Sequence, residues 1–256
     1  MRHILVIGIG AGDPDYLTLQ AVKALGRADV FLVVDKGREK RDLTDLRQLL
    51  LERHAPQPHR IVEVRDPERD RQAAPSAYEG AVDDWRRRRA GLYEGALRDE
   101  LADGETGAFL VWGDPSLYDS TLAALEEVRR RGTVEFTHEV IPGISAVSAL
   151  AARHGTALNQ VGRPVQITTG RRLAEGAPED VDDLVVMLDA HQTFTGLDPE
   201  EDWHIHWGAY LGTEDELLVS GPVREVAPEI ERTRAEARAR KGWIMDTYLL
   251  RRRRSA

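Results

Sequence analysis

The sequence predicts an α/β protein of two domains, and two observations support this prediction. In the first 155 residues, short apolar runs alternate with helical patterns, and three of these runs end in a loop that contains glycine. After residue 155 the alternation weakens, and strand-like runs are separated by turns with little helix between them. Alternating strands and helices are typical of a parallel sheet with helices on both faces. We therefore place the domain boundary near 155–162, which gives domains 1–158 and 159–256.

The elements of the first domain follow from their residue patterns. Ile4–Ile7 is an unbroken aliphatic run, as expected of a buried parallel strand, and four leucines between residues 43 and 50 recur at helical spacing. Gly26 is placed to end the first helix, and Ser145 to cap the last one. The expected strands are 4–7, 30–34, 61–64, 109–112 and 134–141, and the other expected helices are 16–25, 77–101, 122–128 and 145–154.

The second domain reads mainly as strands. Strand-like runs occur within 164–170, 183–190, 203–212 and 216–221. An Arg/Glu/Ala-rich helix is expected over 229–241, followed by a last strand over 243–250.

Composition narrows the class of protein. The 256 residues are 41% hydrophobic and 31% charged, as in a globular protein with a real core. A formal net charge of −9 argues against nucleic acid as a partner. Cysteine is absent, which excludes disulfides, thiolate metal sites and thiol catalysis. No apolar stretch is long enough to span a membrane, and Met1 leads directly into strand residues, so we expect a cytoplasmic protein.

The loop after the first strand invites two interpretations. Gly8, Gly10 and Gly12, with Asp35 ending the next strand, approach the fingerprint of dinucleotide-binding proteins. Asp13 stands where that fingerprint has its last glycine, and a carboxylate there would repel a pyrophosphate. Asp13 fits better as an N-cap, with Pro14 at the first helical position. A nicotinamide-dependent oxidoreductase is therefore the weaker alternative, and a noncatalytic nucleotide-binding module is a third.

The three glycine loops together resemble those of the tetrapyrrole (corrin/porphyrin) methylase family. Residues 8–13 match its G-x-G-x-G-D loop, residues 113–118 its G-D-P-x-x-Y loop, and residues 142–146 its P-G-[IV]-[ST]-[SA] loop. The matches occur in the family's order, and the resemblance covers essentially the whole chain. It implies two α/β domains with the cofactor in the cleft between them, S-adenosylmethionine as methyl donor (S-adenosylhomocysteine as product), a homodimer and no metal.

The resemblance also implies which residues contact the cofactor. Most lie in the three loops, Leu188 or Met187 ends a later strand, and two belong to a small-residue-plus-Thr segment. The implied cofactor residues are Gly10, Ala11, Trp112, Gly113, Asp114, Leu117, Tyr118, Ser145, Ala146, Leu188, Gly212 and Thr213. The chain departs from the family pattern at Ala11, where most members have proline, and at Leu217–Leu218.

Within the family, residues 35–51 and 164–173 resemble members that methylate the ring-A C1 carbon of precorrin-5 and release acetate, on the route to cobalamin. A methylase acting at another corrinoid position is the main alternative. Deacetylation needs an acid or base beside the substrate, and Asp35 at a strand end is the candidate catalytic residue. Because precorrins carry many carboxylates, Lys36, Arg38, Arg41 and Arg171 are candidate substrate-binding residues.

Overall fold

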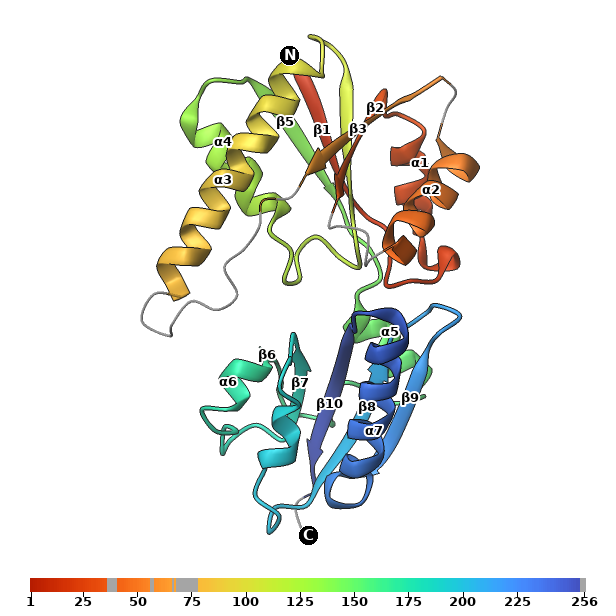
Figure 1. Cartoon of the computed structure of the whole chain (residues 1–256), viewed down its shortest axis with the longest axis vertical. Coiled ribbons are helices and arrows are strands. Elements are labelled where there is room, and N and C mark those ends of the chain that lie inside the picture. The colour runs from red at the N-terminus through yellow and green to blue at the C-terminus, as the bar shows by residue number, and fades with distance from the viewer. Residues whose placement is uncertain (36–40, 56–57, 66, 68–77, 254–256) are drawn as a thin grey trace. The chain divides into compact units, whose positions relative to one another are not determined.

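The computed structural model describes residues 1–35, 41–55, 58–65, 67 and 78–253 (Figure 1). The chain divides into two compact units, one formed by residues 1–10 and 14–144 and the other by residues 11–13 and 145–256. The division therefore falls before Ser145, whereas sequence analysis placed the domain boundary at residue 158. As a result, the helix expected over 145–154 belongs to the second unit.

The first unit is built on a five-stranded parallel sheet with the order β3-β2-β4-β1-β5. Its central strand β1 pairs with both β4 and β5. The carboxyl ends of all five strands therefore lie at one edge of the sheet, where α/β proteins bind ligands. The strands are β1 (Arg2–Gly8), β2 (Val30–Asp35), β3 (Arg60–Arg65), β4 (Thr106–Val111) and β5 (Phe136–Ile141).

Helices cover both faces of this sheet, α3 and α4 on one side and α1 and α2 on the other (Figure 1). Residues of β1 alternate between the two cores: Ile4 and Val6 pack with α3 and α4, and Leu5 and Ile7 with α1 and α2. Burial on both faces explains the unbroken apolar run of this strand. The helices are α1 (Leu19–Leu25), α2 (Arg41–His54), α3 (Tyr78–Asp99) and α4 (Thr121–Arg131).

The second unit contains a mixed five-stranded sheet with the order β6-β7-β10-β8-β9. Strands β6 and β7 are parallel, and β10 is antiparallel to both β7 and β8. Helix α7 packs on one face of the sheet, over a core that includes Trp207 and Tyr248. The elements are α5 (Ala146–Arg153), β6 (Val165–Thr169), α6 (Gly170–Leu173), β7 (Asp183–Met187), η4 (Thr193–Gly196), β8 (Trp203–Ala209), β9 (Leu217–Pro222), α7 (Val223–Lys241) and β10 (Asp246–Arg252).

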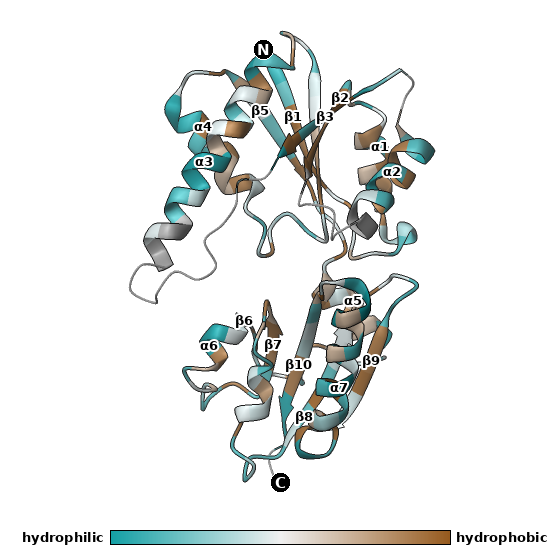
Figure 2. Ribbon diagram, viewed as in Figure 1, coloured by the Kyte–Doolittle hydropathy of each residue, from teal (hydrophilic) through white to brown (hydrophobic). Residues whose placement is uncertain are grey.

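Colouring by hydropathy shows how the strands and the helices of the first unit differ in their patterns (Figure 2). The central strands of the first unit are largely apolar along their length, whereas α3 is hydrophilic over most of its surface. Each expected strand and helix is present, with ends that differ by a few residues. No helix in the described part of the chain is both long and apolar enough to cross a membrane.

Two expected helix starts are wrong. Asp13 does not cap α1, because Pro14 begins a single 3-10 turn, η1 (Pro14–Tyr16), and Thr18 caps α1 by accepting a hydrogen bond from the amide of Ala21 at 3.0 Å. Helix α7 begins at Val223 rather than at 229, with Pro228 inside it. Val223, Val226 and Ala227 of its first turns pack against the core, and this burial offsets the amide that proline lacks.

Candidate active site

The three glycine loops of the first unit meet at the carboxyl edge of its sheet. The amide of Gly113 donates to the carbonyl of Gly10 at 2.8 Å, and the amide of Gly10 donates to the carbonyl of Gly113 at 3.2 Å. A Cβ atom at Gly8 would lie 2.6 Å from the amide nitrogen of Gly143, and one at Gly143 would lie 2.1 Å from the carbonyl oxygen of Gly113. Only glycine allows these backbones to approach so closely.

Asp114 joins two of these loops. Its Oδ2 accepts a hydrogen bond from the amide of Gly143 at 2.9 Å, and its Oδ1 accepts bonds from the amide of Ser116 at 2.8 Å and from the Ser116 hydroxyl. Burial acts to raise the pKa of Asp114, but the hydrogen bonds from Ser116 and Gly143 outweigh it, so that the pKa is lowered. Asp114 is therefore an ionised carboxylate that fixes the 113–118 loop against the 142–144 loop.

The remaining predicted residues of this loop lie beside Asp114. Tyr118 has a left-handed backbone with φ of 50° and is 46% exposed. Leu117 donates its amide to the carbonyl of Asp114 at 3.2 Å. The indole Nε1 of Trp112 is buried without a hydrogen-bond partner. A bulky residue in a left-handed conformation is uncommon and is typical of functional loops.

In the second unit, residues 11–13 pack against residues 211–213. Gly12 has φ of 129°, and a Cβ there would lie 2.3 Å from the carbonyl oxygen of Leu211. Ala11 is almost completely buried. Gly212 also has a positive φ of 76°, and its amide donates to Oε2 of Glu216 at 2.7 Å. The Thr213 hydroxyl donates to the carbonyl of Tyr210 at 2.7 Å, which closes this turn.

Three predicted segments of the second unit share one edge of its sheet. Strands β6, β7 and β8 run in the same direction, because β6 is parallel to β7 and β10 is antiparallel to both β7 and β8. Their carboxyl ends therefore lie at the same edge. Arg171 follows β6, Leu188 follows β7, and Gly212 with Thr213 follows β8.

Leu188 combines two unfavourable features. Its backbone is left-handed with φ of 55°, and its side chain is 66% exposed. Met187, the alternative from sequence analysis, is partly buried at the end of β7. The exposed, strained Leu188 is therefore the better candidate for contact with a ligand.

Ser145 caps α5, as predicted, and its Oγ accepts a hydrogen bond from the amide of Ser148 at 3.1 Å. Ala146 is the first residue of that helix. The cap accounts for the Ser145 hydroxyl, and contact of either residue with a ligand stays a prediction.

The predicted residues for substrate chemistry lie mainly outside the described part of the chain. Lys36 and Arg38 are not described, nor are the side chains of Asp35 and Arg41. The backbone of Asp35 ends β2 at the same sheet edge as the glycine loops. Among the described residues, no group of three or more His, Asp or Glu side chains could hold a metal ion.

Sequence reasoning missed a residue at the edge of the second sheet. Asp189 directly follows Leu188, is 5% exposed, and accepts hydrogen bonds from four donors. At the edge of the first sheet, Gly8 and Gly143 carry close backbone approaches, 2.6 and 2.1 Å from where a Cβ would stand, that were not assigned to the site, although each glycine stands in one of the recognised loops.

Comparison with known proteins agrees with this geometry. The model of the Tetrapyrrole (Corrin/Porphyrin) Methylases family matches residues 3–227. A precorrin-6A synthase (deacetylating) from a Sinorhizobium species is 51% identical over 253 residues, which cover 98% of this chain and 95% of the relative. The crystal structure of a cobalamin synthesis related protein (CobF) from Corynebacterium diphtheriae has a TM-score of 0.84 and 41% identity, with 98% of each chain covered. The uroporphyrin-III C-methyl transferase of Thermus thermophilus, complexed with S-adenyl homocysteine, shares the fold, with a TM-score of 0.58 at 21% identity over 97% of this chain and 91% of that one.

The fold and the interlocked glycine loops are those of a methyltransferase that acts on tetrapyrroles. The chain belongs to the tetrapyrrole (corrin/porphyrin) methylase family. It is accordingly a methyltransferase whose methyl donor is S-adenosylmethionine.

Proposed function

We propose that this protein methylates the ring-A C1 carbon of precorrin-5 and releases acetate, giving precorrin-6A in cobalamin biosynthesis. The observation that carries the proposal is the 51% identity with a deacetylating precorrin-6A synthase over nearly the full length of both chains. The segments 35–51 and 164–173, which set this member apart from its family in the sequence, point to the same reaction.

We propose that the loop residues of each unit contact the methyl donor. In the first unit these are Gly10, Trp112, Gly113, Asp114, Leu117 and Tyr118. In the second unit they are Ala11, Ser145, Ala146, Leu188, Gly212 and Thr213. The close backbone approaches to the carbonyl of Gly113 and at Gly12 support this assignment. The positive φ angles and the exposure of Tyr118 and Leu188 support it as well.

S-adenosylmethionine supplies a methyl group on a sulfonium, and the protein has to hold that group in line with a nucleophilic carbon and exclude water. Rigid backbone loops suit this task because they present fixed amides and carbonyls. Removal of the acetyl group needs water and a proton carrier, and Asp35, at the end of β2, is the proposed acid or base. Lys36, Arg38, Arg41 and Arg171 are the proposed partners of the corrinoid carboxylates.

We further propose that the protein works as a homodimer in the cytoplasm, as the family resemblance implies. Light scattering at micromolar concentration measures the mass in solution. A mass of one chain at concentrations that support full activity would contradict the dimer.

The reaction itself is tested with methyl-labelled S-adenosylmethionine and a panel of precorrins, followed by mass analysis of the corrinoid and measurement of free acetate. Precorrin-5 should gain one methyl group and release one acetate per turnover. Methylation of a different precorrin without acetate would favour the alternative position on the ring. Tight binding of NAD with no binding of S-adenosylhomocysteine would contradict the methyltransferase assignment.

A further inference from the structure

The turn that presents Leu188 needs an explanation, because a leucine that is both left-handed and exposed is unfavourable twice. A residue held in such a conformation costs about 1–3 kcal/mol and persists only where its surroundings fix it. Packing of the Leu188 side chain does little to fix this backbone conformation, since 66% of the residue is exposed. The constraint must therefore come from its neighbours in the chain.

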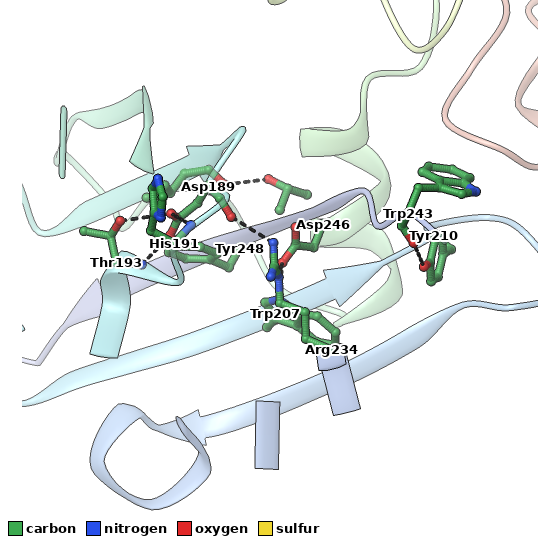
Figure 3. Close-up of polar contacts among 11 residues, drawn as sticks. Asp189, His191, Thr193, Trp207, Tyr210, Arg234, Trp243, Asp246 and Tyr248 are labelled. Atoms are coloured by element: carbon green, nitrogen blue, oxygen red, sulfur yellow. Dashed lines mark hydrogen bonds and ion pairs between the residues drawn. The ribbon is translucent and has the colours of Figure 1, made fainter. Parts of the chain in front are cut away.

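The next residue supplies that constraint. Asp189 is 5% exposed, and each oxygen of its carboxylate accepts two hydrogen bonds (Figure 3). Oδ1 accepts from the amide of His191 at 3.1 Å and from the Thr193 hydroxyl at 2.9 Å. Oδ2 accepts from the amide of Thr193 at 2.6 Å and from the Tyr248 hydroxyl at 2.6 Å. All four donors are neutral amides or hydroxyls, so hydrogen bonds and not an ion pair fix the position of the carboxylate.

The main chain of Asp189 is fixed as well. Its carbonyl accepts a hydrogen bond from Nη2 of Arg234 at 3.1 Å, and the same guanidinium pairs through Nε with Asp246 at 2.8 Å (Figure 3). Arg234 and Asp246 are both buried, with side chains 8% exposed. The residue after Leu188 is thus tied to β10 by Tyr248 and to α7 by Arg234.

The hydroxyl of Tyr248 can donate to this carboxylate only while it is protonated. Burial raises the pKa of Tyr248, and the neighbouring charge of Asp189 raises it further. The phenol is therefore protonated at neutral pH and donates its proton to Oδ2 of Asp189.

Asp189 also packs against the segment that carries Arg171. A Cβ atom at Gly170 would lie 2.4 Å from Cγ and from Oδ1 of Asp189, so the carboxylate fills the space in which a side chain at position 170 would stand. Gly170 is the first residue of α6, and Arg171 follows it. One carboxylate therefore sets the turn after β6 and the turn after β7 at the same edge of the sheet.

We propose that Asp189 is a positioning residue for methyl transfer: its buried carboxylate fixes Leu188 against the methyl donor and sets the spacing between Leu188 and Arg171. This inference rests on the proposed roles of Leu188 and Arg171. Asp189 itself acts through the turn and does not contact the donor.

Asp189→Asn tests the proposal, because the amide nitrogen that replaces one carboxylate oxygen cannot accept the two hydrogen bonds at that position. The two bonds lost are either those from the His191 amide and the Thr193 hydroxyl or those from the Thr193 amide and the Tyr248 hydroxyl. The dissociation constant of S-adenosylhomocysteine, measured by calorimetry, should rise about tenfold, which corresponds to about 1.4 kcal/mol. In steady-state assays the KM values for methyl donor and corrinoid should rise more than kcat falls. The matched control is Asp183→Asn, because Asp183 is a fully buried carboxylate at the opposite end of β7 that pairs with Arg251 at 2.6 Å. That control should lose stability without changing affinity for S-adenosylhomocysteine.

A double-mutant cycle separates positioning from general damage. If Asp189 acts through Leu188, Asp189→Asn should have little further effect on affinity in a Leu188→Ala background. Equal effects of Asp189→Asn in both backgrounds would overturn the proposal. If Asp189→Asn does not fold, Tyr248→Phe removes one of the four donors and keeps the ring, and unchanged affinity in that variant would also overturn it.

The proposed function is tested by a separate result in the same experiment. Failure of the wild-type protein to bind S-adenosylhomocysteine would refute the assigned roles of the site. Tight binding by the wild-type protein, with no loss in Asp189→Asn, would refute the positioning role alone.

Discussion

Substitution of Gly143 by alanine should damage the carboxyl edge of the first sheet without unfolding the protein. Gly143 has no positive φ, so alanine meets no backbone penalty there, and the effect is purely steric. Its Cβ would lie 2.1 Å from the carbonyl oxygen of Gly113 and 2.8 Å from the carbonyl carbon of Gly8. All of these contacts are with backbone, so no flexible side chain can move aside.

The size of the effect follows from these contacts. The 142–144 loop must move by roughly 1 Å, and a displacement of that size at a reacting centre costs about 100-fold in rate. Overpacking of this kind destabilises by about 1–3 kcal/mol. If the movement also breaks the bond from the amide of Gly143 to Asp114, a further 1.5–3 kcal/mol or so is lost, because that acceptor is charged.

Three measurements check this prediction: urea unfolding for stability, calorimetry for S-adenosylhomocysteine affinity, and methyl transfer for turnover. Gly196→Ala is the matched control, since a Cβ there meets nothing within 4 Å and its φ is not positive. The control should behave as the wild-type protein. Wild-type affinity and turnover in Gly143→Ala would show that close backbone approach is not what this edge requires.

Three further predictions concern other parts of the chain. Gly95→Ala, near the C-terminal end of α3, should raise the free energy of unfolding by about 0.5–1 kcal/mol, because alanine favours helix and the new Cβ meets only the end of Arg98 at 3.9 Å. Burial, helped by His204 and other nearby cationic groups, lowers the pKa of His206 to about 4, so the unfolded chain binds its proton first as pH falls. Stability should therefore fall from pH 6.5 towards pH 4 in urea unfolding, and His206→Asn should flatten that slope. Replacement of Arg38 and Arg41 by Gln should raise the KM of the corrinoid far more than that of the methyl donor, and less so at high salt; an unchanged corrinoid KM at low salt would count against their role.

The sequence predicted the first unit well because its strands are buried on both faces. Burial of that kind leaves an unbroken apolar run such as Ile4–Ile7, which hardly any other element produces. The first residues of the helices were harder to predict, because several residues near a helix start can serve as its N-cap. Asp13 and Thr18 are both good N-cap residues, and only the folded loop decides that Thr18 accepts the bond from Ala21.

Charged residues that fold into the interior were beyond reach of sequence patterns. Arg89 stands in a run of four arginines, a pattern that is typical of a solvated helix face, yet it is 4% exposed and donates to the hydroxyl of Tyr93 at 3.1 Å. Arg251 and Arg252 lie beyond the last expected strand, 243–250, yet they belong to β10. A charged side chain is buried only where polar groups in the interior can pair with it. Those groups come from distant parts of the sequence, as Asp183 does for Arg251.

The same reasoning explains why the glycine loops were found and Asp189 was not. A glycine motif marks a position where the backbone needs a positive φ or a close approach, so this requirement can be recognised from the sequence. Backbone strain at other residue types cannot be recognised from the sequence. Among the described residues, four that are not glycine have a positive φ: Tyr118, Leu188, Gln192 and Tyr210. Each of them lies in a segment that follows β4, β7 or β8, and these segments carry the predicted site residues. Strained backbone at about 1–3 kcal/mol per residue persists only where other contacts fix it. The partly buried carboxylate of Asp114 and the buried carboxylate of Asp189 supply such contacts, because each accepts hydrogen bonds from backbone amides of the loop that carries it or of the loop beside it.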